Sequence, residues 1–137
     1  MDRMHYTNGE DTNCRLCTRD PETHDHLFFT CRYSLQVWKY IQAKTHSRWP
    51  NLSWFSLVEW TSRRYQDTKS INNRIGALIL AATVYYIWQE RNRRIFQQLS
   101  QSVSTVGEAI FQVLRDQLMS NNGLSMADGT RAIWNIP

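Results

Sequence analysis

The three cysteines of the chain all lie within residues 14–31, and a histidine stands between the second and the third. Their spacing is Cys-x2-Cys-x8-His-x4-Cys. A structural zinc ion takes four tetrahedral sulfur or nitrogen ligands, and one tight turn can aim both sulfurs of a Cys-x2-Cys pair at the same point. The spacing therefore predicts a structural zinc site. Its predicted ligands are Cys14, Cys17, His26 and Cys31.

Cysteines can also serve as disulfide partners or as plain core residues. The odd number of cysteines, with no apolar leader in residues 1–12, argues against a disulfide framework. The cysteines could still be ordinary buried ones, because free cysteine is among the most buried residue types. His24 is a rival to His26 as the nitrogen ligand. A catalytic zinc is not expected, since four protein ligands leave no position for water.

Length and composition describe one domain. A chain of 137 residues with 42% apolar residues can fill a single hydrophobic core. The most apolar run, residues 75–88, carries no charge but is shorter than the about 20 residues that a bilayer core requires. We therefore expect a buried central helix and no membrane association. Zinc-binding cysteines also favour a reducing compartment, the cytoplasm or the nucleus.

Apolar residues that recur every three or four positions predict four helices. The predicted helices are Ser34–Lys44, one that begins at Ser53 or Ser56, roughly Ile71–Leu99, and one that begins near Thr105. Two of these starts have the form of a capping box, Ser56 with Glu59 and Thr105 with Glu108. The predicted fold class is all-α, a roughly four-helix domain with a small N-terminal CCHC zinc knuckle.

The same sequence patterns predict the domain boundaries. We expect a flexible lead-in at residues 1–13, the zinc knuckle and helical domain at 14–120, and a loosely structured tail at 121–137. Residues 67–70 are predicted to form a turn. Asn121-Asn122-Gly123 is predicted to stop the last helix, because glycine suits the left-handed conformation after a helix.

The last two helices carry apolar stripes. In the second half of the third helix the stripe is Val84, Trp88, Ile95 and Leu99; in the fourth helix it is Val106, Ile110, Val113, Leu114 and Leu118. Glu90 and Arg94 are expected to pair at i,i+4. Asn92 falls on the apolar stripe, so it should have a specific hydrogen-bond partner.

Two motifs together resemble a known family. The first runs from Cys14-Arg-Leu-Cys17 through Glu22 and His26-Leu27-Phe28-Phe29-Thr30-Cys31 to Val37-Trp38; the second is Ile87-Trp88-Gln89-Glu90-Arg91-Asn92-Arg93-Arg94-Ile95-Phe96. They are similar to the zinc-binding domain that follows reverse transcriptase in plant LINE-type retrotransposons. The closing Trp134-Asn135-Ile136-Pro137 resembles the usual end of those polyproteins.

This resemblance implies the same four zinc ligands and an origin as a detached C-terminal domain of a retroelement polyprotein. It does not imply polymerase activity, because the chain contains no Tyr-x-Asp-Asp motif and no acidic triad that we can assemble. No nucleophile–base pair or glycine-rich phosphate loop stands out either. We expect no enzyme, no catalytic residues and no small-molecule substrate. Glu22 and Asp25 are expected to support the zinc ligands.

Nucleic-acid binding, to RNA or DNA, is the first functional hypothesis. The segment between Thr61 and Gln97 contains seven basic and two acidic residues, so its net charge is +5, whereas that of the whole chain is +4. The predicted nucleic-acid-binding residues are Arg63, Arg64, Lys69, Arg74, Arg91, Arg93 and Arg94. Gathered on one surface, they could neutralise several phosphates. The alternative is a solvated helix face with Glu90 paired internally.

The second hypothesis is a module that binds proteins, adopted by a host. The apolar third and fourth helices could then pair with a protein partner or between two copies, as a homodimer. The same stripes would also be explained by the core of a single monomer.

Overall fold

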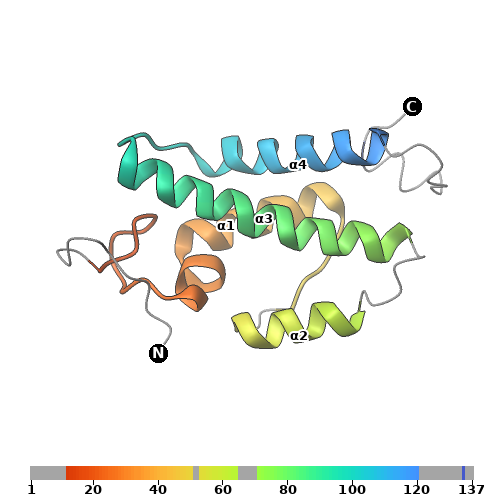
Figure 1. Cartoon of the computed structure of the whole chain (residues 1–137), viewed down its shortest axis with the longest axis horizontal. Coiled ribbons are helices and arrows are strands. Elements are labelled where there is room, and N and C mark those ends of the chain that lie inside the picture. Colours follow the sequence, from red (N-terminus) through yellow and green to blue (C-terminus); the bar gives the residue numbers. More distant parts are fainter. Residues whose placement is uncertain (1–11, 51–52, 65–70, 121–133, 135–137) are drawn as a thin grey trace.

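The computed structural model describes residues 12–50, 53–64, 71–120 and 134. This part of the chain is helical, with an isolated bridge between Asn13 and Pro21 and no longer strand. Figure 1 shows the helices in chain order. They are the short π-helical turn η1 (His26–Thr30), α1 (Arg32–Thr45), α2 (Trp54–Arg64), α3 (Ile71–Phe96) and α4 (Val103–Ser120). The all-α prediction is confirmed. The predicted lead-in, the 67–70 turn, the Asn121–Gly123 stop and most of the tail lie outside the described residues.

Helix α1 begins two residues before the predicted Ser34 and ends one residue after Lys44. Its buried side chains include Val37, Trp38 and Ile41, which follow the three- and four-residue spacing of one helix face. The helix ends at His46, whose left-handed backbone (φ 52°) lets its N–H donate to the carbonyl of Gln42.

The two predicted capping boxes are wrong. Ser56 lies inside the first turn of α2, where its hydroxyl accepts a hydrogen bond from Ser53, and Glu59 pairs with Arg63 instead. Thr105 likewise lies inside α4, and its N–H donates to the hydroxyl of Ser102 (3.2 Å). Each helix therefore starts about one turn before its predicted box. A serine, Ser53 or Ser102, stands directly before each start, at the position where serine caps free N–H groups.

Helix α3 buries a different face from the one predicted. Its buried apolar residues are Ile75, Ile79 and Ile87, joined by Thr83. Only part of the predicted stripe is covered: Val84 and Ile95 are half-buried, whereas Trp88 is 38% exposed. Leu99, at 58%, lies beyond the end of the helix. Tyr85, at 57%, shows that residues 75–88 are not enclosed on all sides. The error arose because this stretch is apolar on several faces, so periodicity could not select the packed one.

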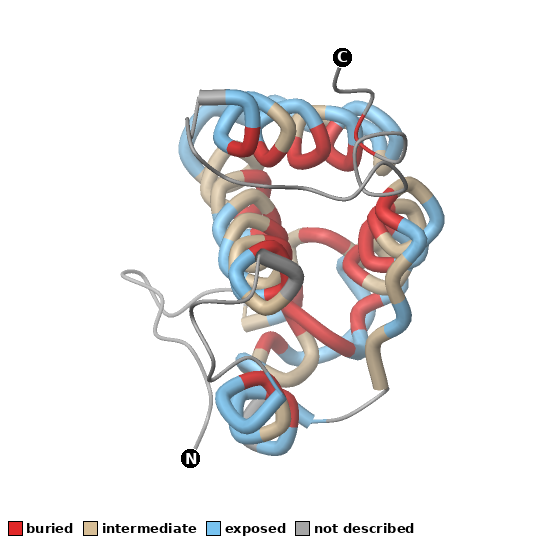
Figure 2. Tube along the Cα trace, turned by 90° about the vertical axis from the view of Figure 1, so that its right-hand side faces the viewer, coloured by how far each residue is buried: buried red, intermediate tan, exposed pale blue. Residues whose placement is uncertain are grey.

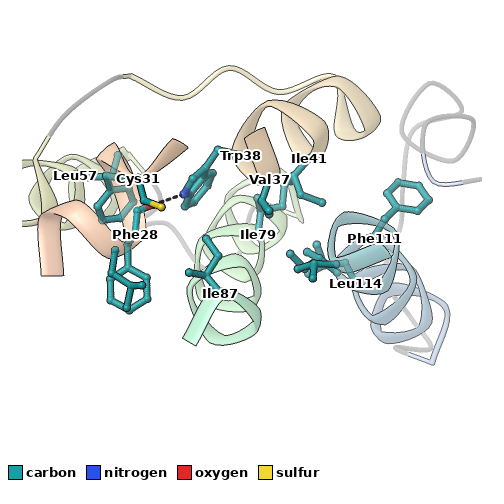
Figure 3. Packing of buried hydrophobic residues seen from close by; sticks show 14 of the residues in the cluster. Phe28, Cys31, Val37, Trp38, Ile41, Leu57, Ile79, Ile87, Phe111 and Leu114 are labelled. Atoms are coloured by element: carbon teal, nitrogen blue, oxygen red, sulfur yellow. Dashed lines mark hydrogen bonds between the residues drawn. The ribbon is translucent and has the colours of Figure 1, made fainter. Parts of the chain in front are cut away.

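Helices α1, α3 and α4 form the body of the molecule. Figure 1 shows α3 and α4 running antiparallel, and α1 packs extensively against α4. Figure 2 shows the buried positions of these helices facing inward, with exposed positions on the outside. The predicted α4 stripe is buried at Val106, Ile110, Leu114 and Leu118, whereas Val113 is 37% exposed. Figure 3 shows Ile79 and Ile87 of α3 near Val37 and Ile41 of α1, with Leu114 beyond them.

A row of aromatic rings connects the N-terminal segment to α2. The ring centroids of successive pairs are 5.6–6.2 Å apart, a spacing at which rings attract one another. The row runs through Phe28, Phe29, Trp38, Trp49 and Trp60. The indole of Trp38 also donates to the carbonyl of Phe28 (2.8 Å). These contacts fix η1 against α1.

The C-terminal segment touches the body at one described residue. Trp134 is buried, its ring is stacked on Phe111 at 5.0 Å, and its carbonyl accepts a hydrogen bond from Arg115. None of the helices in the described part of the chain combines the length and apolar character that a bilayer crossing needs.

Candidate metal centre

The first two cysteines stand in a short hairpin turn. The Asn13–Pro21 bridge and the hydrogen bond from the Cys14 N–H to the Asp20 carbonyl (2.8 Å) close this turn. Inside it, the Leu16 N–H points at the sulfur of Cys14 (3.4 Å). Thr18 adopts a left-handed backbone (φ 63°), and this reverses the chain directly after Cys17. The turn therefore aims both sulfurs to the same side.

The other two candidate ligands are placed by η1. The N–H of Cys31 donates to the carbonyl of His26 (2.6 Å), a hydrogen bond across five residues. In an α-helix, with 3.6 residues per turn, positions five apart point to different sides. The wider π-turn brings them to the same side, and such turns are frequent at functional sites. The x4 spacing between His26 and Cys31 is the sequence signal for this turn.

The structure brings the four predicted ligand residues together. One donor atom from each of Cys14, Cys17, His26 and Cys31 lies within 4.8 Å of all the others. The sulfurs of Cys14 and Cys31 are 3.8 Å apart, and the sulfur of Cys17 is 3.2 Å from Nε2 of His26. Two sulfurs bound to one tetrahedral zinc at about 2.3 Å would be about 3.8 Å apart. The donor set and its spacing fit zinc.

The environment favours thiolate at Cys31. Its pKa is lowered, first because the thiol of Cys14 donates a hydrogen bond to its sulfur. The N–H groups of Ser34 and Tyr33, in the first turn of α1, lower it further. The pKa of Cys14 is raised by that same thiol contact and by burial. The thiol proton of Cys14 therefore lies between the sulfurs of Cys14 and Cys31, and a zinc ion bound to both sulfurs would take its place. All three cysteines are free.

His26 is oriented at both ring nitrogens. Nε2 faces Cys17, and Nδ1 is 3.2 Å from the hydroxyl of Thr30. The backbone N–H of His26 donates to the hydroxyl of Thr23 (3.0 Å). His24 is not in the donor cluster, so the geometry favours His26 as the nitrogen ligand. No sequence pattern pointed to Thr30, whose role depends on the π-turn.

Glu22, which was expected to support the zinc ligands, forms a buried ion pair with α3. Glu22 is completely buried, and both of its carboxylate oxygens accept hydrogen bonds from the guanidinium of Arg91 on α3 (2.8 and 3.1 Å). Arg94 adds a hydrogen bond to the carbonyl of Leu16 (3.1 Å). Two arginines of α3 therefore hold the metal-binding segment on the helical body. The residues in the pair are 69 positions apart, and no local pattern links them.

A second buried carboxylate, Glu90 of α3, binds the neighbouring arginines. Its buried carboxylate accepts hydrogen bonds from Arg93, from Arg94 (2.8 Å) and from the N–H of Gln101 (2.8 Å). The predicted Glu90–Arg94 pair is confirmed. Through Gln101, Glu90 also fixes the connection between α3 and α4. The predicted partner of Asn92 is its neighbour Arg91, which donates to Oδ1 (2.9 Å).

Of the seven predicted nucleic-acid-binding residues, these contacts separate the described ones into those occupied by internal carboxylates and those exposed to solvent. Arg91 is only 6% exposed, and its guanidinium is occupied by Glu22, so it is not on a surface that phosphates can reach. Arg93 and Arg94 are mostly buried side chains bound to Glu90. Arg63, Arg64 and Arg74 are exposed, and Arg63 pairs with Glu59. Lys69 lies outside the described residues. The structure does not gather the described members of the set on one surface.

A comparison with known protein families supports a metal-binding role for the four-residue cluster. Residues 1–38, which contain all four donors, match the family described as zinc-binding in reverse transcriptase. This part of the chain is therefore similar to a zinc-binding domain associated with reverse transcriptase, and its Cys3His cluster could hold the ion. No curated protein and no solved structure matches the chain. The family is a zinc-binding one rather than a catalytic one. The plant LINE type is a finer assignment and stays a prediction.

Proposed function

We propose that the chain holds one structural zinc ion through Cys14, Cys17, His26 and Cys31, and that it serves a retroelement reverse transcriptase as a nucleic-acid-binding domain. The observation that supports the zinc site is the convergence of four donor atoms within 4.8 Å. Three sulfurs and one nitrogen complete a tetrahedral shell, so the metal has no open position for a substrate. The role of the zinc is structural.

In this role the four residues join two separate pieces of chain. The hairpin turn supplies two sulfurs, and η1 with the start of α1 supplies the imidazole and the third sulfur. Zinc adds a direct link between these two pieces. Because thiolate and neutral imidazole are needed, each proton that binds in acid competes with the metal.

The test is the metal content of protein purified without added zinc. We expect about one zinc per chain, lost in His26→Ala and kept in His24→Ala. The His24 variant is a matched control, because it removes an imidazole only two residues away. Full metal content in His26→Ala, or loss of metal in His24→Ala, would refute this ligand set.

The nucleic-acid function is supported by the net charge of +4 and by cations that are exposed on the described part of the chain. Binding that neutralises phosphates releases counterions, so affinity must fall as salt rises. Fluorescence anisotropy with labelled RNA and DNA oligonucleotides at low and moderate salt measures this. Affinity that is unchanged across that range would contradict phosphate binding.

A second candidate function is association with a protein, including another copy of the chain. The observation that favours it is the exposed apolar surface of α3 and the residues after it, where Tyr85 (57%), Phe96 (74%) and Leu99 (58%) face solvent. Sedimentation over a wide concentration range tests the homodimer. A constant monomer mass would exclude self-association.

A further inference from the structure

A hollow lies beside the metal centre. It has a volume of about 840 Å³ and is open to solvent. One wall is the hairpin turn from Leu16 to Asp20, and the other is a face of α1. Cys17 and Thr30, which belong to the metal centre and its immediate surroundings, also line it. We call this hollow the basic groove.

Three cations line the basic groove, at least one on each wall. Arg19 comes from the hairpin turn, and Arg32 and Lys39 come from α1. All three are exposed, and within the described residues none of them forms an ion pair. Asp20 is the one acidic residue in the lining, so the lining carries a net charge of +2. This differs from the arginines of α3, which are occupied by internal carboxylates.

The spacing of the α1 wall suits an extended anion. Arg32, Gln36 and Lys39 follow one another at i, i+4 and i+7, which places them on one side of the helix over about 10 Å. Two cations at the ends of this row can contact separate phosphates, and the amide of Gln36 can hydrogen-bond between them. A single small anion would use only one of these positions.

The groove also has apolar and aromatic side chains that a nucleic-acid base could contact. Leu16, Tyr33 and Leu35 line it between the charged groups. Tyr33 is held in place, because its hydroxyl donates to the carbonyl of Gln101 (2.8 Å) and Arg94 lies over its ring. Grooves that combine cations along the backbone with fixed apolar or aromatic surface are typical of single-strand binding.

We propose that the basic groove binds the phosphodiester backbone of a single-stranded nucleic acid, with Arg19, Arg32 and Lys39 as its phosphate contacts. This proposal rests on the nucleic-acid function proposed above and names its site. It also links the site to zinc. As a zinc ligand, Cys17 would add a restraint to the wall that carries Arg19, so removal of the metal would loosen that wall and weaken binding.

The experiment compares two variants with the same change of charge. The groove variant is Arg32→Gln/Lys39→Gln, and the control is Arg64→Gln/Arg74→Gln, which alters exposed arginines that do not line the groove. Anisotropy with single-stranded RNA, single-stranded DNA and a duplex is measured from low to moderate salt. Zinc content and helical circular dichroism confirm that both variants fold.

Each phosphate contact with a single strand contributes about 0.7 to the slope of log K against log salt. The groove variant should therefore lose about 1.4 of that slope, and the control should keep it. An unchanged groove variant with a weakened control would overturn the groove and leave nucleic-acid binding intact. Tighter binding to duplex than to either single strand would overturn it too. A zinc-loaded wild-type protein that binds none of the three would refute both the groove and the nucleic-acid function.

Discussion

At the metal centre, Thr30 decides which nitrogen of His26 faces the sulfurs. Its hydroxyl is 3.2 Å from Nδ1, so that nitrogen can donate its proton and Nε2 is left for the metal. The hydroxyl comes from the last residue of η1, one turn after the imidazole. A side chain outside the ligand set therefore fixes the geometry of the ligand.

We predict that Thr30→Val weakens zinc binding by about 10- to 100-fold, the usual effect of losing a hydrogen bond to a ligand histidine. Valine has nearly the same shape as threonine, so packing is kept while the hydrogen bond is lost. Competition with a chelator of known affinity measures the change. Thr30→Ser keeps the hydroxyl and should bind as the wild type does; equal affinity of all three proteins would contradict this role.

The buried pair between Glu22 and Arg91 is expected to matter far more than an exposed one. Glu22→Gln leaves the guanidinium of Arg91 without its charged partner in a site that water hardly reaches, which costs about 3–5 kcal/mol of unfolding free energy. The exposed pair of Glu59 and Arg63 is the control, and Glu59→Gln should cost less than about 1 kcal/mol. Urea unfolding measures both. Equal losses of unfolding free energy in the two variants would show that the buried pair does not hold the metal-binding segment on the helical body.

At the level of helices, the contact between α1 and α4 depends on a glycine. A Cβ atom on Gly107 would overlap the ring of Tyr40, closer than two carbons can approach. The ring cannot simply swing away, because its hydroxyl donates to Glu108, which also pairs with Lys44. The glycine lets the two helices come together at this point.

We predict opposite effects of Gly107→Ala in two backgrounds. In the wild type, the clash with Tyr40 should destabilise the protein by about 1–3 kcal/mol. In Tyr40→Ala the clash is gone, and the higher helix propensity of alanine should stabilise it by up to about 1 kcal/mol. Thermal or urea unfolding of the four proteins gives both values. The same sign in both backgrounds would contradict this packing.

The ligand set and the helices were predictable from the sequence because both depend on local spacing. The Cys-x2-Cys pair and the His-x4-Cys pair specify their own turns, and the helix faces of α1 and α4 repeat at regular intervals. The Glu22–Arg91 pair was not predictable, since its partners meet only after α3 folds back on the N-terminal segment. The arginines of α3 were misassigned for the same reason, because a basic run has the same sequence whether it faces solvent or a buried carboxylate.

At the scale of the whole molecule, hydrogen bonds, a buried ion pair and apolar packing join the metal-binding segment to the helical body. Arg91 and Arg94 of α3 reach the segment, and the buried Leu27, Phe28 and Phe29 pack it inward. Because these contacts connect the segment to α1 and α3, loss of zinc should lower the free energy of unfolding of the helical body as well as disorder the four ligands.

We predict that the free energy of unfolding of the zinc-loaded protein falls as pH is lowered below about 8.5, where the cysteine thiols of the unfolded chain bind protons. The folded, metal-bound state holds its ligands deprotonated, whereas the unfolded state binds protons on them, so stability must rise with pH across this range. Chemical denaturation at several pH values measures the slope. His26→Ala should lose most of this slope; an identical slope in the variant would contradict the linkage to zinc.

X-ray absorption at the zinc edge of the purified protein tests the central claim most directly, because it counts the atoms bound to the metal and measures their distances. The four-residue site predicts three sulfurs at about 2.3 Å and one nitrogen at about 2.0–2.1 Å, with no bound water. A shell with fewer than three sulfurs, or with a water oxygen in place of the imidazole, would contradict the proposed structural zinc centre.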